Sequence, residues 1–108
     1  MALSKSFTLN SGATGDYTRL VTFRWDRSTR EAVALFALYL NAAAAQSGKE
    51  PLSPFIAKLR LTGDKFDQYL GNPALAQADV VAQLYVAAKV EPLACDFGAN
   101  AFADAADV

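Results

Sequence analysis

The sequence predicts an α+β domain: a mostly antiparallel sheet of about four strands with one C-terminal helix packed on a face. Three observations lead to it. The runs DYTRLVTFRW and REAVALFALYLN have the period-2 alternation typical of β-strands and form a hairpin over residues 16–41. Two shorter runs, at residues 3–9 and 55–62, alternate in the same way. Apolar residues then recur at helical spacing over residues 73–90.

Composition favours a single domain over residues 1–108. Of the 108 residues, 53% are hydrophobic and 19% charged, which excludes a disordered chain. No run approaches the roughly 20 apolar residues of a membrane span, and the N-terminus lacks the apolar segment of a secretory signal. We therefore expect synthesis in the cytosol and no membrane partner.

Cysteine and histidine content limits the chemistry of the chain. The single Cys95 cannot form an internal disulfide, and without histidine the usual ligand sets of zinc, haem and copper are absent. We expect no metal and no other cofactor.

Charge is distributed unevenly along the chain. Residues 1–70 carry nine Lys and Arg against six Asp and Glu, whereas residues 71–108 carry one against five. This asymmetry can favour head-to-tail contacts between identical copies, although two solvated ends explain it more simply.

The first strand is expected at residues 3–9 (LSKSFTL), half-buried and suited to a sheet edge. Leu3, Phe7 and Leu9 alternate with small polar residues, so one face is apolar and the other is wet. A turn rich in glycine and small polar residues follows at residues 11–15.

The hairpin carries apolar side chains on both faces. In its first strand, the alternation places four of them on one side: Tyr17, Val21, Phe23 and Trp25. In its second strand, two sets oppose each other: Ala32, Ala34, Phe36, Leu38 and Leu40 against Val33, Leu35 and Tyr39. A strand that is apolar on both faces is normally covered above and below. Because the chain is short, another subunit can supply the second cover.

Residues 42–54 are expected to form the longest loop. Four alanines begin it, but Gly48, Pro51 and Pro54 end any helix that these alanines start. Lys49 and Glu50 lie at its tip, where a protruding loop can contact a partner.

The strand at residues 55–62 (FIAKLRLT) is expected to have one wet face. Phe55, Ala57, Leu59 and Leu61 point one way, and the other face carries the following residues: Ile56, Lys58, Arg60 and Thr62.

Two helices and a tail complete the chain. A short helix is expected at residues 64–70, with Asp64 as its N-cap. Asn72 and Pro73 suit the start of the longer helix at residues 73–90, which can cover one face of the sheet.

Residues 91–108 are small and acidic and lack a basic residue. We expect them to form a weakly specified acidic tail, which Phe97 and Phe102 can dock onto the domain.

Paired carboxylates are the only candidates for catalysis. Asp64 and Asp67 lie three residues apart, as do Asp104 and Asp107, and either pair could transfer protons if burial raised one pKa. Helix capping and solubility explain both pairs more simply. Cys95 has no histidine to activate it as a nucleophile. We therefore expect that the chain is not an enzyme.

Arginine and aromatic residues alternate in the hairpin and raise the question of nucleic-acid binding. The residues concerned are Tyr17, Arg19, Phe23, Arg24, Trp25, Arg27 and Arg30. A basic strand surface with exposed aromatic rings can stack bases. Acidic residues lie among these arginines, however, and the chain has a net charge of −1, so arginine stems packed over rings are the simpler interpretation. A tryptophan at a strand end beside a turn more often lies at the edge of the core than in an interface. Trp25 is nevertheless our first choice for a subunit contact, because interface anchors are enriched in tryptophan.

The sequence resembles a family of small structural proteins encoded among the tail genes of tailed bacteriophages. The motifs that carry the resemblance span nearly the whole chain: MALSKSFTLNSG, GDYTRL, a Pro-Leu before the last strand, GDKFDQYL, LYVAAK and FADAADV.

The resemblance implies a structural virion protein at the tail tip or baseplate, assembled in the cytoplasm of the host bacterium. Its expected partners are other virion proteins and further copies of itself, as a ring or trimer. Two alternatives remain open: a capsid head decoration protein, and a soluble module for single-stranded nucleic acid. The resemblance and the residue patterns described above together lead us to expect the following protein-interface residues: Tyr17, Arg19, Arg24, Trp25, Lys49, Glu50 and Phe102.

Overall fold

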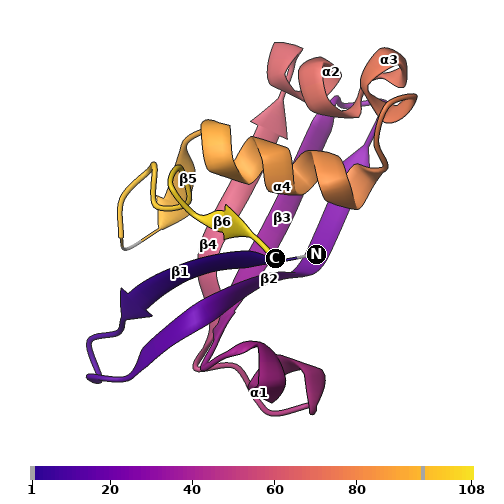
Figure 1. Cartoon of the computed structure of the whole chain (residues 1–108). Helices are drawn as coiled ribbons and strands as arrows, with labels where there is room; N and C mark the ends of the chain where they lie inside the picture. The colour runs from indigo at the N-terminus through magenta and orange to yellow at the C-terminus, as the bar shows by residue number, and fades with distance from the viewer. Residues whose placement is uncertain (1, 96) are drawn as a thin grey trace.

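The computed structural model of the chain describes residues 2–95 and 97–108 and contains one six-stranded antiparallel sheet and four helices (Figure 1). In chain order the elements are β1 (Leu3–Thr8), β2 (Thr14–Asp26), β3 (Glu31–Tyr39), α1 (Ala42–Gln46), β4 (Ser53–Thr62), α2 (Asp64–Leu70), α3 (Asn72–Leu75), α4 (Val80–Val90), β5 (Leu93–Cys95) and β6 (Ala106–Asp107). The strand order is β5-β4-β3-β2-β1-β6, and the sheet curls into a half-barrel.

The α+β class and the antiparallel sheet are confirmed, but the prediction of four strands and one helix is wrong. The two additional strands, β5 and β6, come from residues 91–108 and are three and two residues long. Strands this short are below the length at which alternation can be recognised in a sequence. The additional helices α1 and α3 have five and four residues.

The predicted hairpin is the centre of the sheet, but a β-bulge changes which of its residues share a face. Tyr17 pairs with Tyr39 and Leu20 with Phe36, and the register shifts between Leu20 and Thr22. An inserted residue moves every later side chain to the opposite face. The prediction that Tyr17 shares a face with Phe23 and Trp25 is therefore wrong.

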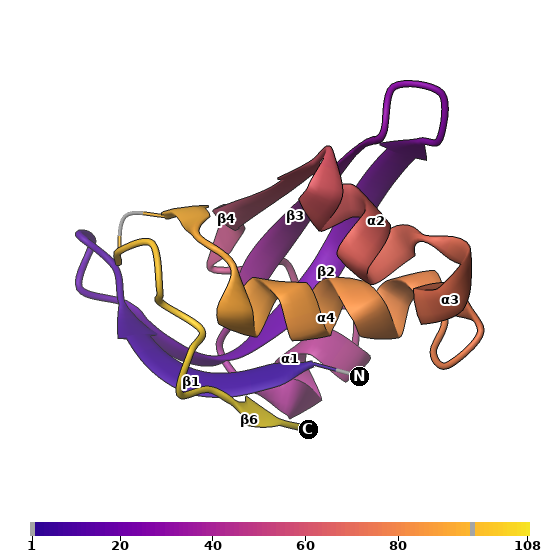
Figure 2. The same cartoon turned by 90° about the horizontal axis from the view of Figure 1, so that it is seen from above.

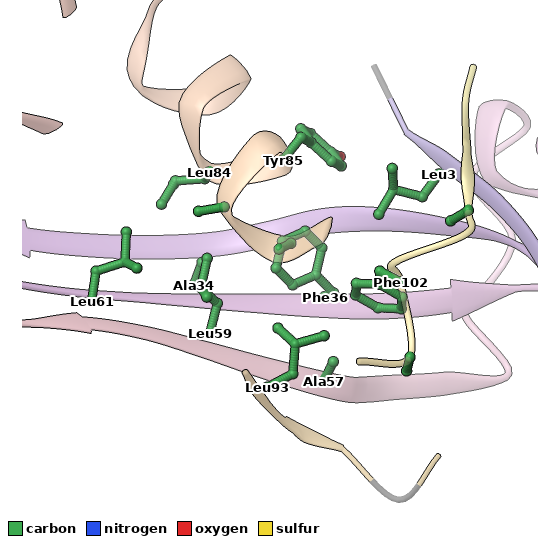
Figure 3. Close-up of a cluster of buried hydrophobic side chains, with 14 of the residues drawn as sticks. Leu3, Ala34, Phe36, Ala57, Leu59, Leu61, Leu84, Tyr85, Leu93 and Phe102 are labelled. Carbon is green, nitrogen blue, oxygen red and sulfur yellow. The ribbon is translucent and has the colours of Figure 1, made fainter. Parts of the chain in front are cut away.

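Helices cover one face of the sheet, which we call the covered face. Figure 2 shows α2, α3 and α4 together on this side. In the close-up of the core, Leu84 and Tyr85 of α4 lie above Ala34 and Phe36 of β3 (Figure 3). At the bulge, the backbone N–H of Leu20 donates to the hydroxyl of Tyr85 at 2.7 Å. The helix therefore packs on the sheet and also satisfies a backbone group that the bulge leaves unpaired.

The predicted helix at residues 73–90 is two helices. The chain breaks after α3, and Asp79 adopts an extended conformation with its side chain accepting from the N–H of Ala82 at 2.8 Å. Asp79 is thus the N-cap of α4. For α2 the expected cap is also different, because Gly63 occupies the N-cap position with φ of 57° and Asp64 is the first helical residue. Within the expected loop at residues 42–54, Asn41 caps α1 through the N–H of Ala44.

Residues 97–108 close one end of the core. Phe102 is 0% exposed and packs edge-on against Phe36 and Phe7, with ring centroids 5.6 and 5.9 Å apart. β6 pairs with β1, so that β1 is not the outermost strand along its whole length. Ala2 and Val108 exchange two backbone hydrogen bonds of 3.0 Å, and the two ends of the chain lie side by side (Figure 1).

Candidate protein-interaction surface

The second face of the sheet, which we call the open face, carries no covering layer of helices from the residues that the structure describes. Cross-strand pairs define its residues: Tyr17 and Tyr39, Arg19 and Ala37, then Thr22, Leu35 and Lys58, then Arg24, Val33 and Arg60. Within residues 2–95 and 97–108, α2, α3 and α4 lie on the covered face, and α1 lies at the end of the sheet (Figures 1 and 2). The open face is thus available to a partner along the middle of β2, β3 and β4.

Cationic side chains flank the open face on two strands. Arg19 and Arg24 project from β2, and Lys58 and Arg60 project from β4, all of them exposed. Arg60 forms an ion pair with Glu31 at 3.2 Å. In the part of the chain that the structure describes, the other three cations have no ion pair. The open face therefore presents a positive field on both sides of β3.

Apolar side chains occupy the centre of the open face. Val33 and Leu35 of β3 are half-buried among the cationic stems. Together with Thr22, Arg24 and Lys58 they line a shallow hollow of about 350 Å³. An apolar centre with a charged rim is the usual anatomy of a protein interface.

The structure brings together only some of the residues expected at an interface. Tyr17, Arg19 and Arg24 all lie on the open face, although strict alternation would place Arg24 on the opposite face, because the bulge in β2 shifts it. Trp25 lies on the covered face, where its ring packs 6.2 Å from that of Phe66 and beneath the guanidinium of Arg27 at 5.1 Å. Phe102 is in the core and does not reach the surface.

Lys49 and Glu50 are exposed after α1, as expected for a protruding tip. They are separate from the open-face cluster in the sheet. Val33, Leu35, Lys58 and Arg60 were not identified as interface residues. Alternation placed these four residues on the correct face of their strands, but it was wrong at the start of β4, where Phe55 is 62% exposed and Ile56 is buried. Only the register between strands shows that the faces of β3 and β4 combine.

A second exposed feature is the outer edge of β2. The pairing of β1 with β2 reaches only Thr18, and β2 continues to Asp26. Val21 at the bulge and Phe23 beyond it are 41% and 39% exposed. An unpaired strand edge with apolar side chains is a site for contact with another chain.

The carboxylates considered for catalysis are engaged in ion pairs instead. Arg30 binds Asp67 through a short charge-assisted hydrogen bond and lies 3.5 Å from Asp64. The hydrogen bond and charge of Asp67 raise the pKa of Arg30. Asp104 accepts from Lys5 at 2.6 Å, and this hydrogen bond lowers the pKa of the carboxyl. Asp107 lies 3.4 Å from Lys89.

Among the carboxylates of the described residues, that of Glu91 is buried. It accepts from the hydroxyl of Tyr69 at 2.8 Å and pairs with Lys65 at 3.1 Å. The hydrogen bond from Tyr69 lowers the pKa of Glu91, with a further contribution from Lys65. Burial and the same hydrogen bond raise the pKa of Tyr69 to about 12. Because Glu91 follows α4 and Tyr69 lies in α2, this pair joins two helices of the covering layer.

Comparison of the chain with protein-family models, curated proteins and solved structures gives no match. Among the described residues, no group of three or more histidine, cysteine, aspartate and glutamate side chains is placed to hold a metal ion. None of the helices in that same part of the chain is long and apolar enough to cross a membrane.

Proposed function

We propose that this chain is a structural protein of a tailed-bacteriophage virion, positioned at the tail tip or baseplate and held there by protein contacts. The observation that carries the proposal is the open face, in which an apolar centre flanked by cations is left without a covering layer. The sequence resemblance to small tail-module proteins supports the same function.

Contacts between copies are part of the proposal, as a ring or trimer. The unpaired outer edge of β2 offers one surface for them. The outer side of α4 offers another, because Val86 and Val90 lie one turn apart and are both exposed. Light scattering of the purified chain measures the number of copies directly, and a monomer at all concentrations would remove this part of the proposal.

The test of the virion proposal is quantitative mass spectrometry of purified phage particles, with heads and tails separated. We expect the chain in the tail fraction at a constant number of copies per particle. Its recovery in the head fraction would instead support the alternative, a head decoration protein. Its absence from both fractions would contradict any structural role in the virion.

A second candidate function, binding of single-stranded nucleic acid, is favoured by the cations of the open face. Arg19, Arg24 and Lys58 have no acidic partner in the described part of the chain and could contact phosphates. A salt-dependent mobility shift with an oligonucleotide, weakened by Arg24→Glu, would support this function. The absence of a shift at low salt would remove it.

A further inference from the structure

We propose that the open face binds an acidic amphipathic helix of a partner protein, which lies along β3 with an apolar ridge on Val33 and Leu35 and carboxylates on both flanks. The inference rests on the proposed function, because it names the chemistry of the partner that this face would meet in an assembly. Its first support is the arrangement of the cations, which lie on both strands beside β3 and leave the centre apolar.

The dimensions of the open face match a helix. Its flanking cations lie on β2 and β4, which are two strand spacings or roughly 10 Å apart. An α-helix with its side chains is about 10–12 Å wide, so acidic residues on its two sides would reach both rows. Along β3, the accessible apolar centre runs from Val33 to Leu35, about 7 Å or roughly five helical residues, because Ala37 is 1% exposed.

The backbone of the open face also favours a helix over an added strand. β3 is hydrogen-bonded to β2 on one side and to β4 on the other, so its backbone has no free groups for an incoming strand. Only side chains are available, and a helix lying on a sheet is the usual way to cover such a surface. The covered face already has this arrangement, in which α4 packs on Ala34 and Phe36 (Figure 3).

Charge disfavours a face-to-face pair of identical copies. Such a pair would bring the four cations of each open face together, with Asp26 and Glu31 at one end to offset part of their charge on each side. Like charges at an interface oppose association. An acidic partner has the opposite effect, because it neutralises the three cations that lack an ion pair in the described part of the chain.

The position of the aromatic rings disfavours nucleic acid. Base stacking requires ring faces on the binding surface. Phe23 and Trp25 lie on the covered face because of the bulge, and Tyr17 and Tyr39 pack against each other edge-on at one end, 6.5 Å apart. The centre of the open face is aliphatic, as suits the ridge of a helix.

The experiment measures binding of labelled synthetic peptides to the purified full chain by fluorescence anisotropy. The probe is a helical peptide of about 18 residues, long enough to form a helix, with a leucine ridge and glutamate on both flanks. One control peptide has lysine in place of glutamate, and another has glutamine in place of leucine. We expect the acidic peptide to bind at least about tenfold more tightly than either control, with an affinity that falls as salt rises.

Matched variants locate the site. Arg24→Glu should weaken binding of the acidic peptide about fivefold or more, because it replaces an attraction with a repulsion. Lys49→Glu makes the same charge change at the exposed tip after α1 and should alter binding less than about twofold. Circular dichroism of both variants checks that they fold.

Four results would overturn the inference. The first is equal binding of the acidic and lysine peptides, and the second is an equal effect of Arg24→Glu and Lys49→Glu on that binding. The third is that an oligothymidine binds more tightly than the acidic peptide and that Arg24→Glu abolishes its binding. The fourth is that Arg24→Glu changes the molar mass of the chain in solution. The third would identify a nucleic acid and the fourth a second copy as the occupant. Particle composition is measured independently, so the chain can be present in virions while the helix proposal fails, or absent while the peptide binds.

Discussion

At the scale of single residues, Glu91 shows how a buried charge can be tolerated in a small domain. The residue is 8% exposed, yet its carboxylate has both a hydrogen-bond donor in Tyr69 and a cation in Lys65. A buried carboxylate without such partners would cost several kcal/mol. The satisfied pair instead connects α2 to the end of α4.

Replacing Glu91 with glutamine tests this connection. Because the folded state lowers the pKa of Glu91, the carboxylate contributes stability above its unfolded pKa, and this contribution is lost as pH falls through the lower folded pKa. We expect Glu91→Gln to reduce the free energy of unfolding at pH 7 by roughly 1.5–3 kcal/mol and to flatten its decline in acid. Urea unfolding at several pH values measures both effects, and an unchanged acid profile would contradict this assignment.

Tyr69 should affect stability in alkali. Its pKa is raised to about 12, so its contribution is complete below the unfolded value of 10 and is lost as pH rises from there through 12. Tyr69→Phe should therefore remove part of the alkaline loss of stability. Tyr17→Phe is the control, because Tyr17 is half-buried on the open face. Equal alkaline unfolding profiles of the two variants would contradict the prediction.

At the scale of elements, local signals predicted the hairpin and α2 well, because their alternation and helical spacing are continuous in sequence. The break between α3 and α4 was missed because apolar residues keep helical spacing through it. Asp79 was a signal that could have revealed the break, since aspartate is a preferred N-cap. The bulge in β2 gives no signal in the side-chain pattern, and it reversed the placement of Phe23 and Trp25.

Removal of the Asp79 cap should destabilise the domain. In Asp79→Ala, the N–H of Ala82 loses its side-chain acceptor, and we expect a loss of about 1 kcal/mol in the free energy of unfolding. Asp16→Ala is the matched control, because Asp16 is exposed and has no side-chain hydrogen bond or ion pair within the described residues. Equal midpoints of thermal unfolding for the two variants would show that α4 does not depend on its cap.

At the scale of the whole molecule, the candidate site exists only because distant segments are in register. Arg24, Val33 and Arg60 form one row across three strands, although local alternation assigned only Val33 and Arg60 to a face, each within its own strand. A sequence pattern gives the face of a strand relative to itself. It does not give the neighbour of that strand or its offset, so the open-face cluster could not be predicted completely.

Residues 91–108 also depend on contacts with distant segments, although they were expected to form a weakly specified tail. Their anchoring depends on Phe102. Phe102→Ala should lower the free energy of unfolding by about 3–5 kcal/mol, because it removes a fully buried ring from the core. Phe97→Ala is the control, since Phe97 is 38% exposed although it also contacts Phe7. Equal losses of stability in urea would contradict the anchoring role of Phe102.

The packing of Phe102 against Phe7 and Phe36 also has a consequence for synthesis on the ribosome. β1 to β4 are made first, but this part of their apolar surface stays uncovered until residue 102 leaves the exit tunnel. Native closure of the core therefore has to wait for residues 97–108, although the strands that they cover are made well before them. During that interval this apolar surface of the sheet stays exposed, and exposed apolar surface on an incompletely folded domain favours aggregation.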